Sequence, residues 1–234
     1  MEVTDAPPGE RSSILKWGAA CAWAAGVLTA TAAITYLIMP SEQRAAIKGV
    51  ELLPSFAADP GLLKAEFWQL ALVGIAGLGL VPALSRLVSA GSPGLVRWFA
   101  NIAFVGYAVS AVSYFLTLGR LPGVADAYVA GDASTKAALL AVWRSSLDLQ
   151  AFWQFVAVGL FILLFSVLAL RLSVLPVPLC YLGIAAGILH FFAPLGVGLK
   201  EASFLTAVVA VATVLAPIWY IWVGVATWRI AEQG

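Results

Sequence analysis

Charged side chains are scarce in this sequence. Lys, Arg, Asp and Glu together make up 11% of the 234 residues, whereas hydrophobic residues make up 62%. A soluble domain has roughly a quarter charged and about half apolar residues, so this composition is typical of an integral membrane protein. The net charge is +1 and the basic residues are scattered singly, which provides no basic patch for nucleic acid.

Histidine and cysteine are rarer still. The one histidine, His190, cannot supply both ligands of a bis-histidine haem, and no cluster of zinc ligands accompanies it. We therefore predict no metal site and no cofactor. A tetrapyrrole ligated by His190 is a minor alternative, since Phe191 and Phe192 would suit a flat macrocycle. The two cysteines, Cys21 and Cys180, fall inside predicted spans and are most simply small packing residues.

Groups for catalysis and ion transport are missing from the centres of the apolar runs. No acidic or basic residue lies near the middle of a run, where intramembrane charge marks ion pathways and proton relays. This disfavours a pump or ion-coupled carrier, and also a retinal Schiff base, which needs a mid-span lysine. The serines have no candidate base except His190, and no Gly-x-Ser-x-Gly elbow occurs. We predict that the protein is not an enzyme.

Long apolar runs are what the sequence has in abundance. A helix needs about 20 mostly apolar residues to cross the hydrocarbon core. None of the runs alternates apolar and polar residues as a membrane barrel strand does, and helices satisfy their own backbone groups in lipid. We predict an all-α integral membrane bundle of six transmembrane helices, at residues 14–38, 67–88, 96–118, 149–170, 174–196 and 203–228.

The basic residues predict the orientation of the bundle. The short connections "SRLVSAGSPGLVR" and "RLSVLP" carry basic residues and no acid, as cytoplasmic loops do. The two long connections, residues 40–66 and 119–148, carry acids as well as bases. We therefore expect both termini in the cytoplasm, with residues 1–13 as an N-terminal tail and residues 14–234 as a single transmembrane domain.

Each long outer connection is expected to contain a short interfacial helix. Apolar residues between Pro40 and Pro54 recur at a spacing compatible with an amphipathic helix. Residues 119–148 begin as a turn rich in proline and glycine, after which Ser134 could cap a helix that runs to about Arg144. Both segments would tuck against the membrane surface as covers, and their role is left open.

A repeated pattern links two of the predicted spans. "AEFWQLALVGIAGLGLVPALSRL" (65–87) and "QAFWQFVAVGLFILLFSVLALRL" (150–172) share Phe-Trp-Gln near the start, a Val-Gly pair, and Arg-Leu at the end. The preceding spans match more weakly, each with a basic residue followed by Trp. Residues 14–90 and 96–172 are therefore either a tandem repeat of two parallel hairpins or a chance match between apolar runs. Parallel hairpins would differ from the inverted repeats of many transporters.

Tryptophan marks the expected membrane levels, because its amphipathic ring prefers the interface. Trp68 and Trp153 fall at the outer ends of the second and fourth spans. Three more lie beside basic residues at the inner ends, namely Trp17, Trp98 and Trp228.

Polar residues at the outer ends of the spans are the candidate ligand contacts. Gln69 and Gln154 lie about one turn inside the hydrocarbon, where an amide needs a partner. Each could bond to a neighbouring helix, to the other glutamine or to a ligand. Glu66 and Asp148, just before them, would suit the positive end of a helix dipole.

The order of spans and outer segments resembles the DUF4386 family of small bacterial multi-span membrane proteins. The most characteristic stretch is "LPVPLCYLGIAAGI" (175–188), which is similar to that family's proline-containing approach to the fifth span followed by Leu-Gly-Ile. The resemblance implies a multi-pass protein of the bacterial cytoplasmic (inner) membrane. It implies no reaction and no catalytic residues.

Three hypotheses about function remain open. The leading one is a non-catalytic accessory or scaffold subunit, whose partners are the lipid bilayer and other membrane protein subunits. The alternative is a binding protein or carrier for a small apolar ligand (a lipid, quinone or pigment), contacted by Gln69, Gln154 and His190. The third, an enzyme acting on lipid, would need Glu66, Asp148 and His190 to meet on the outer side.

Overall fold

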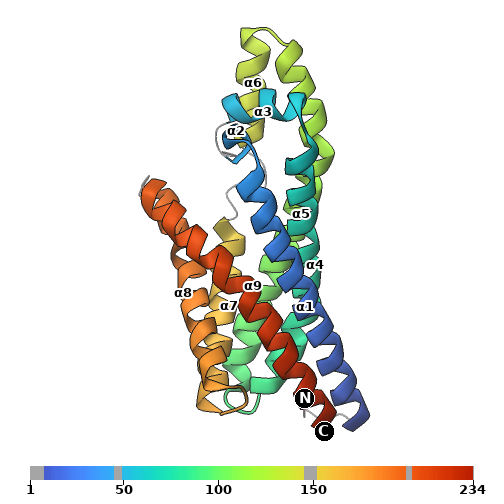
Figure 1. Ribbon diagram of the computed structural model, residues 1–234, viewed down its shortest axis with the longest axis vertical. Coiled ribbons are helices and arrows are strands. Elements are labelled where there is room, and N and C mark those ends of the chain that lie inside the picture. Colours follow the sequence, from blue (N-terminus) through green and yellow to red (C-terminus); the bar gives the residue numbers. More distant parts are fainter. Residues whose placement is uncertain (1–7, 45–48, 145–151, 199–201, 234) are drawn as a thin grey trace.

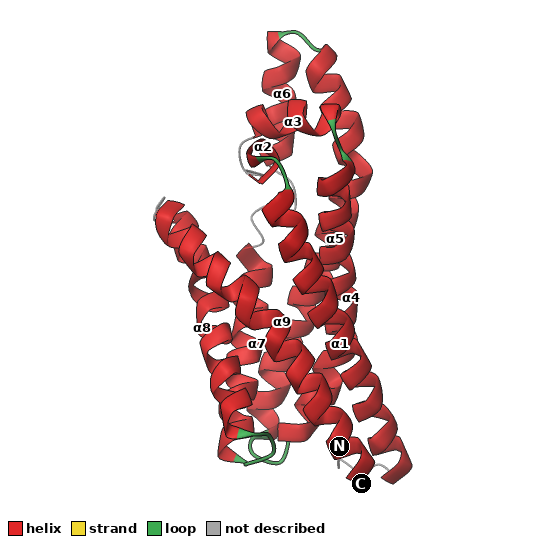
Figure 2. Ribbon diagram, in the orientation of Figure 1, coloured by secondary structure: helices red, strands yellow, loops and turns green. Residues whose placement is uncertain are grey.

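The computed structural model describes residues 8–44, 49–144, 152–198 and 202–233, and the regular structure of this part of the chain is helical (Figures 1 and 2). Six of these helices are long and apolar enough to cross a membrane. They are α1 (Pro8–Ile38), α4 (Gly61–Val88), α5 (Pro93–Ala130), α7 (Phe152–Arg171), α8 (Val177–Gly198) and α9 (Ala202–Gln233). The prediction of an all-α bundle with six membrane spans is confirmed.

The six spanning helices form a closed ring in chain order. Each helix packs against the next, from α1 and α4 through α5, α7 and α8 to α9, and α9 packs back against α1. α1 begins and α9 ends at the same end of the molecule, as an even number of spans requires (Figure 1). We call this the inner end. A hydrogen bond from Ser12 Oγ to the Ala231 carbonyl oxygen (2.8 Å) closes the ring there.

The spanning helices extend beyond their predicted boundaries, and α5 extends the furthest. α1 begins at Pro8, inside the segment expected to be a tail, and proline suits the first turn of a helix. α5 continues to Ala130 through Pro122, so the predicted turn at the start of residues 119–148 is wrong. Its 38 residues reach about 57 Å at about 1.5 Å per residue, far more than the roughly 30 Å hydrocarbon core. The outer end of α5 therefore projects past the membrane.

The three short helices pack around this projecting part of α5. They are α2 (Ser41–Arg44), α3 (Gly49–Ala58) and α6 (Ala133–Arg144), and together with the outer end of α5 we call them the outer module. Leu121, Ala125 and Tyr128 of α5 are buried in its core, separate from the core of the ring. This packing holds α5 helical past its proline, which local sequence signals could not predict.

The short helices predicted in both outer connections are present, with different boundaries. The first connection forms two helices, and Pro54 lies inside α3 instead of after it. Asp132, not Ser134, caps α6, because its Oδ1 accepts hydrogen bonds from the Thr135 backbone N–H (2.8 Å) and from Ser134 Oγ (2.9 Å).

Large aromatic side chains fill the ring from about the bilayer centre toward its inner end. Phe161 lies between Phe99 and Phe165, with ring centroids 5.7 and 6.1 Å away, and Phe165 meets Trp219 edge-on at 6.1 Å. All four side chains are fully buried. Helix association in lipid depends on such close packing, since lipid tails are as apolar as the helices.

The two helices that carry the repeated sequence pattern, α4 and α7, make equivalent contacts. A Cβ at Gly74 of α4 would lie 2.8 Å from the Ala111 backbone nitrogen of α5. A Cβ at Gly159 of α7 would lie 2.5 Å from the Phe191 backbone nitrogen of α8. Corresponding glycines therefore allow each helix to approach closely the helix that follows its predicted hairpin. Common ancestry of the two hairpins stays a prediction.

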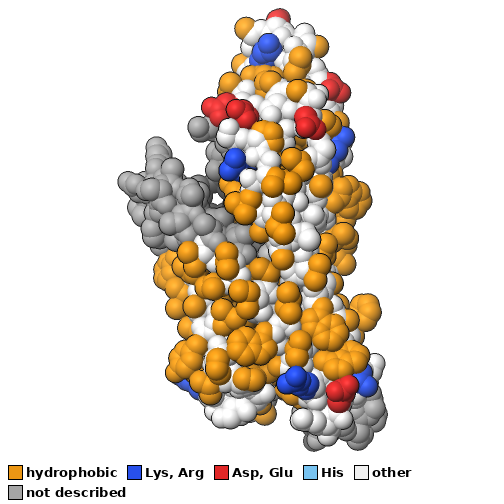
Figure 3. Space-filling model, viewed as in Figure 1, with side chains coloured by type: hydrophobic (Ala, Val, Ile, Leu, Met, Phe, Trp, Pro, Cys, Tyr) orange, Lys and Arg blue, Asp and Glu red, His pale blue; other side chains and the backbone are white. Residues whose placement is uncertain are grey.

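The surface has the zones of a membrane protein. In Figure 3 an apolar band covers the spanning helices, and charged side chains of both signs lie at its inner edge and on the outer module. Four of the predicted anchors, Trp17, Trp68, Trp98 and Trp153, are exposed. Trp228 is partly buried, and its Nε1 donates a hydrogen bond to Glu232 Oε1 (2.8 Å).

Candidate functional site

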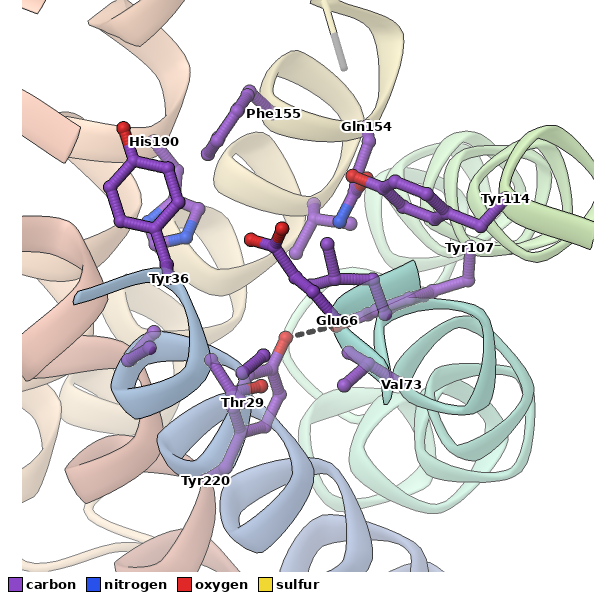
Figure 4. A pocket seen from close by; sticks show the side chains of 15 residues that line it. Thr29, Tyr36, Glu66, Val73, Tyr107, Tyr114, Gln154, Phe155, His190 and Tyr220 are labelled. Carbon is purple, nitrogen blue, oxygen red and sulfur yellow. Dashed lines mark hydrogen bonds between the residues drawn. The ribbon is translucent and has the colours of Figure 1, made fainter. Parts of the chain in front are cut away.

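A cavity of about 240 Å³ lies inside the ring, and all six spanning helices line it (Figure 4). Every one of these helices contributes at least one polar side chain. The polar lining consists of Thr29 and Tyr36 (α1), Glu66 (α4), Tyr107 and Tyr114 (α5), Gln154 (α7), His190 (α8) and Tyr220 (α9). The apolar lining consists of Ala32, Ala33, Leu70, Val73, Phe155, Val158 and Ala216.

The cavity extends from near the bilayer centre to the outer boundary of the hydrocarbon. We take the inner boundary from Arg86 and Arg229, since basic side chains at helix ends reach the interface. Nine residues separate Tyr220 from Arg229 along α9, or about 14 Å, which is close to half of the roughly 30 Å core. Twenty residues separate Glu66 from Arg86 along α4, or about 30 Å. Tyr220 is therefore at the deep end of the cavity and Glu66 at its mouth.

Two tyrosines form the floor of the cavity. The hydroxyl groups of Tyr107 and Tyr220 lie 2.6 Å apart and link α5 to α9 across the ring. Both side chains are buried, and the filled inner core begins directly beneath them. One hydroxyl donates to the other, and the second hydroxyl hydrogen has no acceptor among the described residues. The floor can therefore donate a hydrogen bond to a molecule in the cavity.

His190 lies on the wall formed by α8. Its Nδ1 is 2.9 Å from the Ala186 carbonyl oxygen, and its ring packs against Phe155 with centroids 5.6 Å apart. A carbonyl oxygen can only accept, so Nδ1 carries the hydrogen and the neutral ring has its lone pair at Nε2. The imidazole can therefore accept a hydrogen bond from a ligand.

Glu66 is the one acid that the described part of the chain places on the cavity lining, and this part places no Lys or Arg there. The side chain is half-buried, and in Figure 4 its carboxyl group points into the space between His190 and Gln154. No described residue forms an ion pair with it. The expected role at the start of a helix is wrong, because α4 begins at Gly61 and Glu66 lies beyond its first turn.

The structure separates the two glutamines that the sequence made equivalent. Gln154 lines the cavity, together with His190. Gln69 does not line it, and its Oε1 accepts a hydrogen bond from Thr35 Oγ1 of α1 (3.3 Å). Gln69 therefore serves helix packing, and two of the three predicted ligand contacts share one site. Asp148 lies outside the described residues, so its proximity to Glu66 and His190 stays a prediction.

Sequence reasoning did not find the tyrosines of the cavity. Tyrosine prefers the membrane interface, whereas Tyr107 lies half-way along its apolar run and Tyr220 about two-thirds along its own, away from both ends. A tyrosine far from both ends of a predicted span was the sequence signal that could have identified them. The described residues contain no group of three or more His, Cys, Asp or Glu side chains that could hold a metal ion.

Comparison with known proteins places the chain in a family. The family model described as "Domain of unknown function (DUF4386)" matches residues 21–225, which includes all or part of every spanning helix and every cavity residue. Neither the curated proteins nor the solved structures contain a match to the chain. On the strength of the family match, the chain belongs to the DUF4386 family.

Proposed function

We propose that this protein binds or carries a small, mostly apolar molecule whose polar group occupies the central cavity. The observation that carries this proposal is a polar-lined cavity to which every spanning helix contributes, above an inner half that is filled with aromatic side chains. Ligand sites are typically concave and mainly apolar, with a few polar groups that fix orientation. The alternative hypothesis from the sequence therefore becomes the leading one.

The size of the cavity limits what it can hold. Its volume of about 240 Å³ is slightly below the roughly 300–1,000 Å³ of sites that enclose a drug-sized molecule. A compact headgroup fits this volume better than a whole tetrapyrrole macrocycle. An apolar tail, if the ligand has one, would leave through the mouth beside Glu66 and the exposed Tyr36.

The orientation of the protein decides from which side the ligand comes. The family resemblance suggests the bacterial cytoplasmic membrane, and we propose that both termini are in the cytoplasm, because basic residues without acids occur in the short loops at the inner end. The cavity mouth then faces the outer leaflet, and the tyrosine floor separates it from the cytoplasm.

The two glutamines provide a matched test of this function. Mass spectrometry of the protein purified from native membranes should detect a bound small molecule in the wild type and in Gln69→Ala. Gln154→Ala should lose it, because Gln154 lines the cavity and Gln69 contacts α1. Absence of a bound molecule from the wild type, or equal occupancy in both variants, would contradict the proposal.

An accessory subunit is the second candidate. Val50 and Val129 are 54% and 55% exposed on the outer module, which projects past the membrane where lipid does not cover them. A partner that covers this surface would be recovered by affinity purification in mild detergent from the wild type and lost in Val129→Glu. Recovery of the wild type as a partner-free monomer would count against this role.

A further inference from the structure

The charge of the cavity lining restricts the ligand further than its shape does. Among the described residues, Glu66 is the one Asp or Glu that faces the cavity, and neither Lys nor Arg lines it. A carboxylate that is partly withdrawn from water is costly unless a cation or several hydrogen-bond donors compensate it. An anionic headgroup would add a second negative charge to the same small space. A cationic group is the complement that the described lining residues do not supply.

The aromatic side chains around Glu66 favour an organic cation. Tyr36 of α1, Tyr114 of α5 and Phe155 of α7 line the same cavity, and in Figure 4 Tyr36 and Phe155 lie on one side of the Glu66 carboxyl group and Tyr114 on the other, beyond Gln154. Aromatic rings attract ammonium groups through their electron-rich faces, and sites for quaternary ammonium are built from such rings. A small metal cation would instead need a cluster of oxygen or nitrogen ligands, and the described residues contain no cluster of His, Cys, Asp and Glu.

The hydrogen-bonding groups deeper in the cavity are compatible with a cationic ligand. His190 presents the lone pair of Nε2 when neutral, since Nδ1 donates to Ala186. It can accept from an N–H or O–H of the ligand. The free hydrogen of the Tyr107 and Tyr220 hydroxyl pair can donate to an oxygen at the other end of the ligand.

We propose that the cavity binds an ammonium-bearing molecule, with the Glu66 carboxylate as the counter-ion and the rings of Tyr36, Tyr114 and Phe155 around the cation. The inference rests on the proposed binding function and adds the chemical class of the ligand. The ammonium group could belong to a soluble amine or to the headgroup of an aminolipid, because both present the same chemistry to the mouth of the cavity.

Three probes of similar shape and different charge test this inference. Choline, its uncharged carbon isostere dimethylbutanol, and the anion dimethylbutanoate are each measured by equilibrium dialysis against the purified protein. We expect choline to bind at least about tenfold more tightly than dimethylbutanol, and dimethylbutanoate more weakly than either. Equal binding of choline and dimethylbutanol would overturn the proposal.

Variants of Glu66 assign the effect to one side chain. Glu66→Gln keeps the shape of the side chain and should remove the preference for choline while binding of dimethylbutanol is unchanged. Glu66→Asp should restore part of the preference, and Glu42→Gln, at an exposed acid of α2, should leave it intact. Loss of both probes from Glu66→Gln would show a structural role for Glu66 and overturn the proposal.

The same measurements separate failure of this inference from failure of the binding function. Dimethylbutanol that binds as tightly as choline and independently of Glu66 would leave the cavity a binding site without charge selectivity. No binding of any probe, with no molecule found in the native protein, would remove both proposals. Competition in nanodiscs identifies the source, since an aminolipid displaces choline only if its headgroup enters the cavity.

Discussion

The inner and outer halves of the ring use the same six helices in different ways. From about the bilayer centre toward the inner end, Phe161, Phe165 and Trp219 meet inside the ring and leave it filled. Toward the outer end, small residues such as Ala32 and Ala216 face inward, and a cavity with polar walls remains. Empty space in a packed interior forfeits van der Waals contacts. The contrast indicates that the inner half supplies packing stability, whereas the outer half gives up packing, as the proposed binding function requires.

Removing an aromatic side chain from the inner half should have the largest effect. Trp219→Ala should lower the free energy of unfolding by about 3–5 kcal/mol, because Trp219 is 0% exposed and leaves a large void. Trp222 of the same helix is 38% exposed, so Trp222→Ala should cost much less. Reversible denaturation in mixed micelles compares the two. Similar losses from both substitutions would contradict a tightly filled inner half.

Adding side-chain volume should destabilise the filled inner half and not the outer half, where the cavity has room for it. Ala226 packs in the filled core of the ring, so Ala226→Leu should cost about 1–3 kcal/mol through overpacking. Ala216 lines the cavity, so Ala216→Leu should leave the free energy of unfolding nearly unchanged and should abolish ligand occupancy. The comparison fails if Ala216→Leu destabilises the protein as strongly as Ala226→Leu does.

The tyrosine floor is the boundary between the halves, and its hydrogen bond should contribute about 1 kcal/mol. Tyr107→Phe and Tyr220→Phe each remove one of the two hydroxyl groups that lie 2.6 Å apart. A double-mutant cycle on the free energy of unfolding should therefore show positive coupling, with the double variant no less stable than the worse single variant. Strictly additive losses would show that the two hydroxyl groups do not interact.

The smallest effect is expected outside the ring, at the cap of α6. The backbone hydrogen bond from Thr135, followed by side-chain hydrogen bonds from Thr135 and Ser134, lowers the pKa of Asp132 to about 2. An aspartate with a lowered folded-state pKa stabilises the fold above its ordinary value of about 4, and this contribution is lost as the pH falls toward 2. The protection of the Thr135 amide from hydrogen exchange should therefore decrease as the pH falls from about 4 to about 2.

Two substitutions separate the cap from its neighbours. Asp132→Ala should speed exchange at the Thr135 amide near neutral pH, whereas Ser134→Ala should change it less, because the backbone hydrogen bond to Asp132 remains. An unchanged exchange rate in Asp132→Ala would show that the Asp132 carboxylate does not cap α6.

The six spans could be predicted because the signal is local. A run of about 20 apolar residues forms a helix in lipid whatever packs beside it. The length of α5 could not be predicted in this way. Pro122 and Gly123 look like a turn in the sequence, and the helix continues only because Leu121 and Tyr128 find partners in the outer module.

The cavity depends on which helix each side chain faces, which the sequence does not state. Gln69 and Gln154 occupy the same position in the repeated pattern, yet Gln69 meets Thr35 of α1 and Gln154 faces the cavity. Tyr107 and Tyr220 are 113 residues apart and meet only because the ring closes. Polar residues inside spans can therefore be identified from sequence, whereas their grouping into one site cannot.

Thiol labelling tests most directly whether the outer half contains a cation-selective cavity. Cys21 and Cys180 are replaced by alanine, and a single cysteine is placed at Ala216 in the cavity or at Ala226 in the filled half. Each is exposed to a cationic and to an anionic methanethiosulfonate, with rates normalised to a cysteine at the exposed Ser134.

We expect the cysteine at position 216 to react, and to favour the cationic reagent by at least about tenfold until Glu66→Gln is added. The cysteine at position 226 should not react with either reagent. Equal reactivity at the two positions, or a preference at position 216 that survives Glu66→Gln, would contradict a cavity whose charge is set by Glu66.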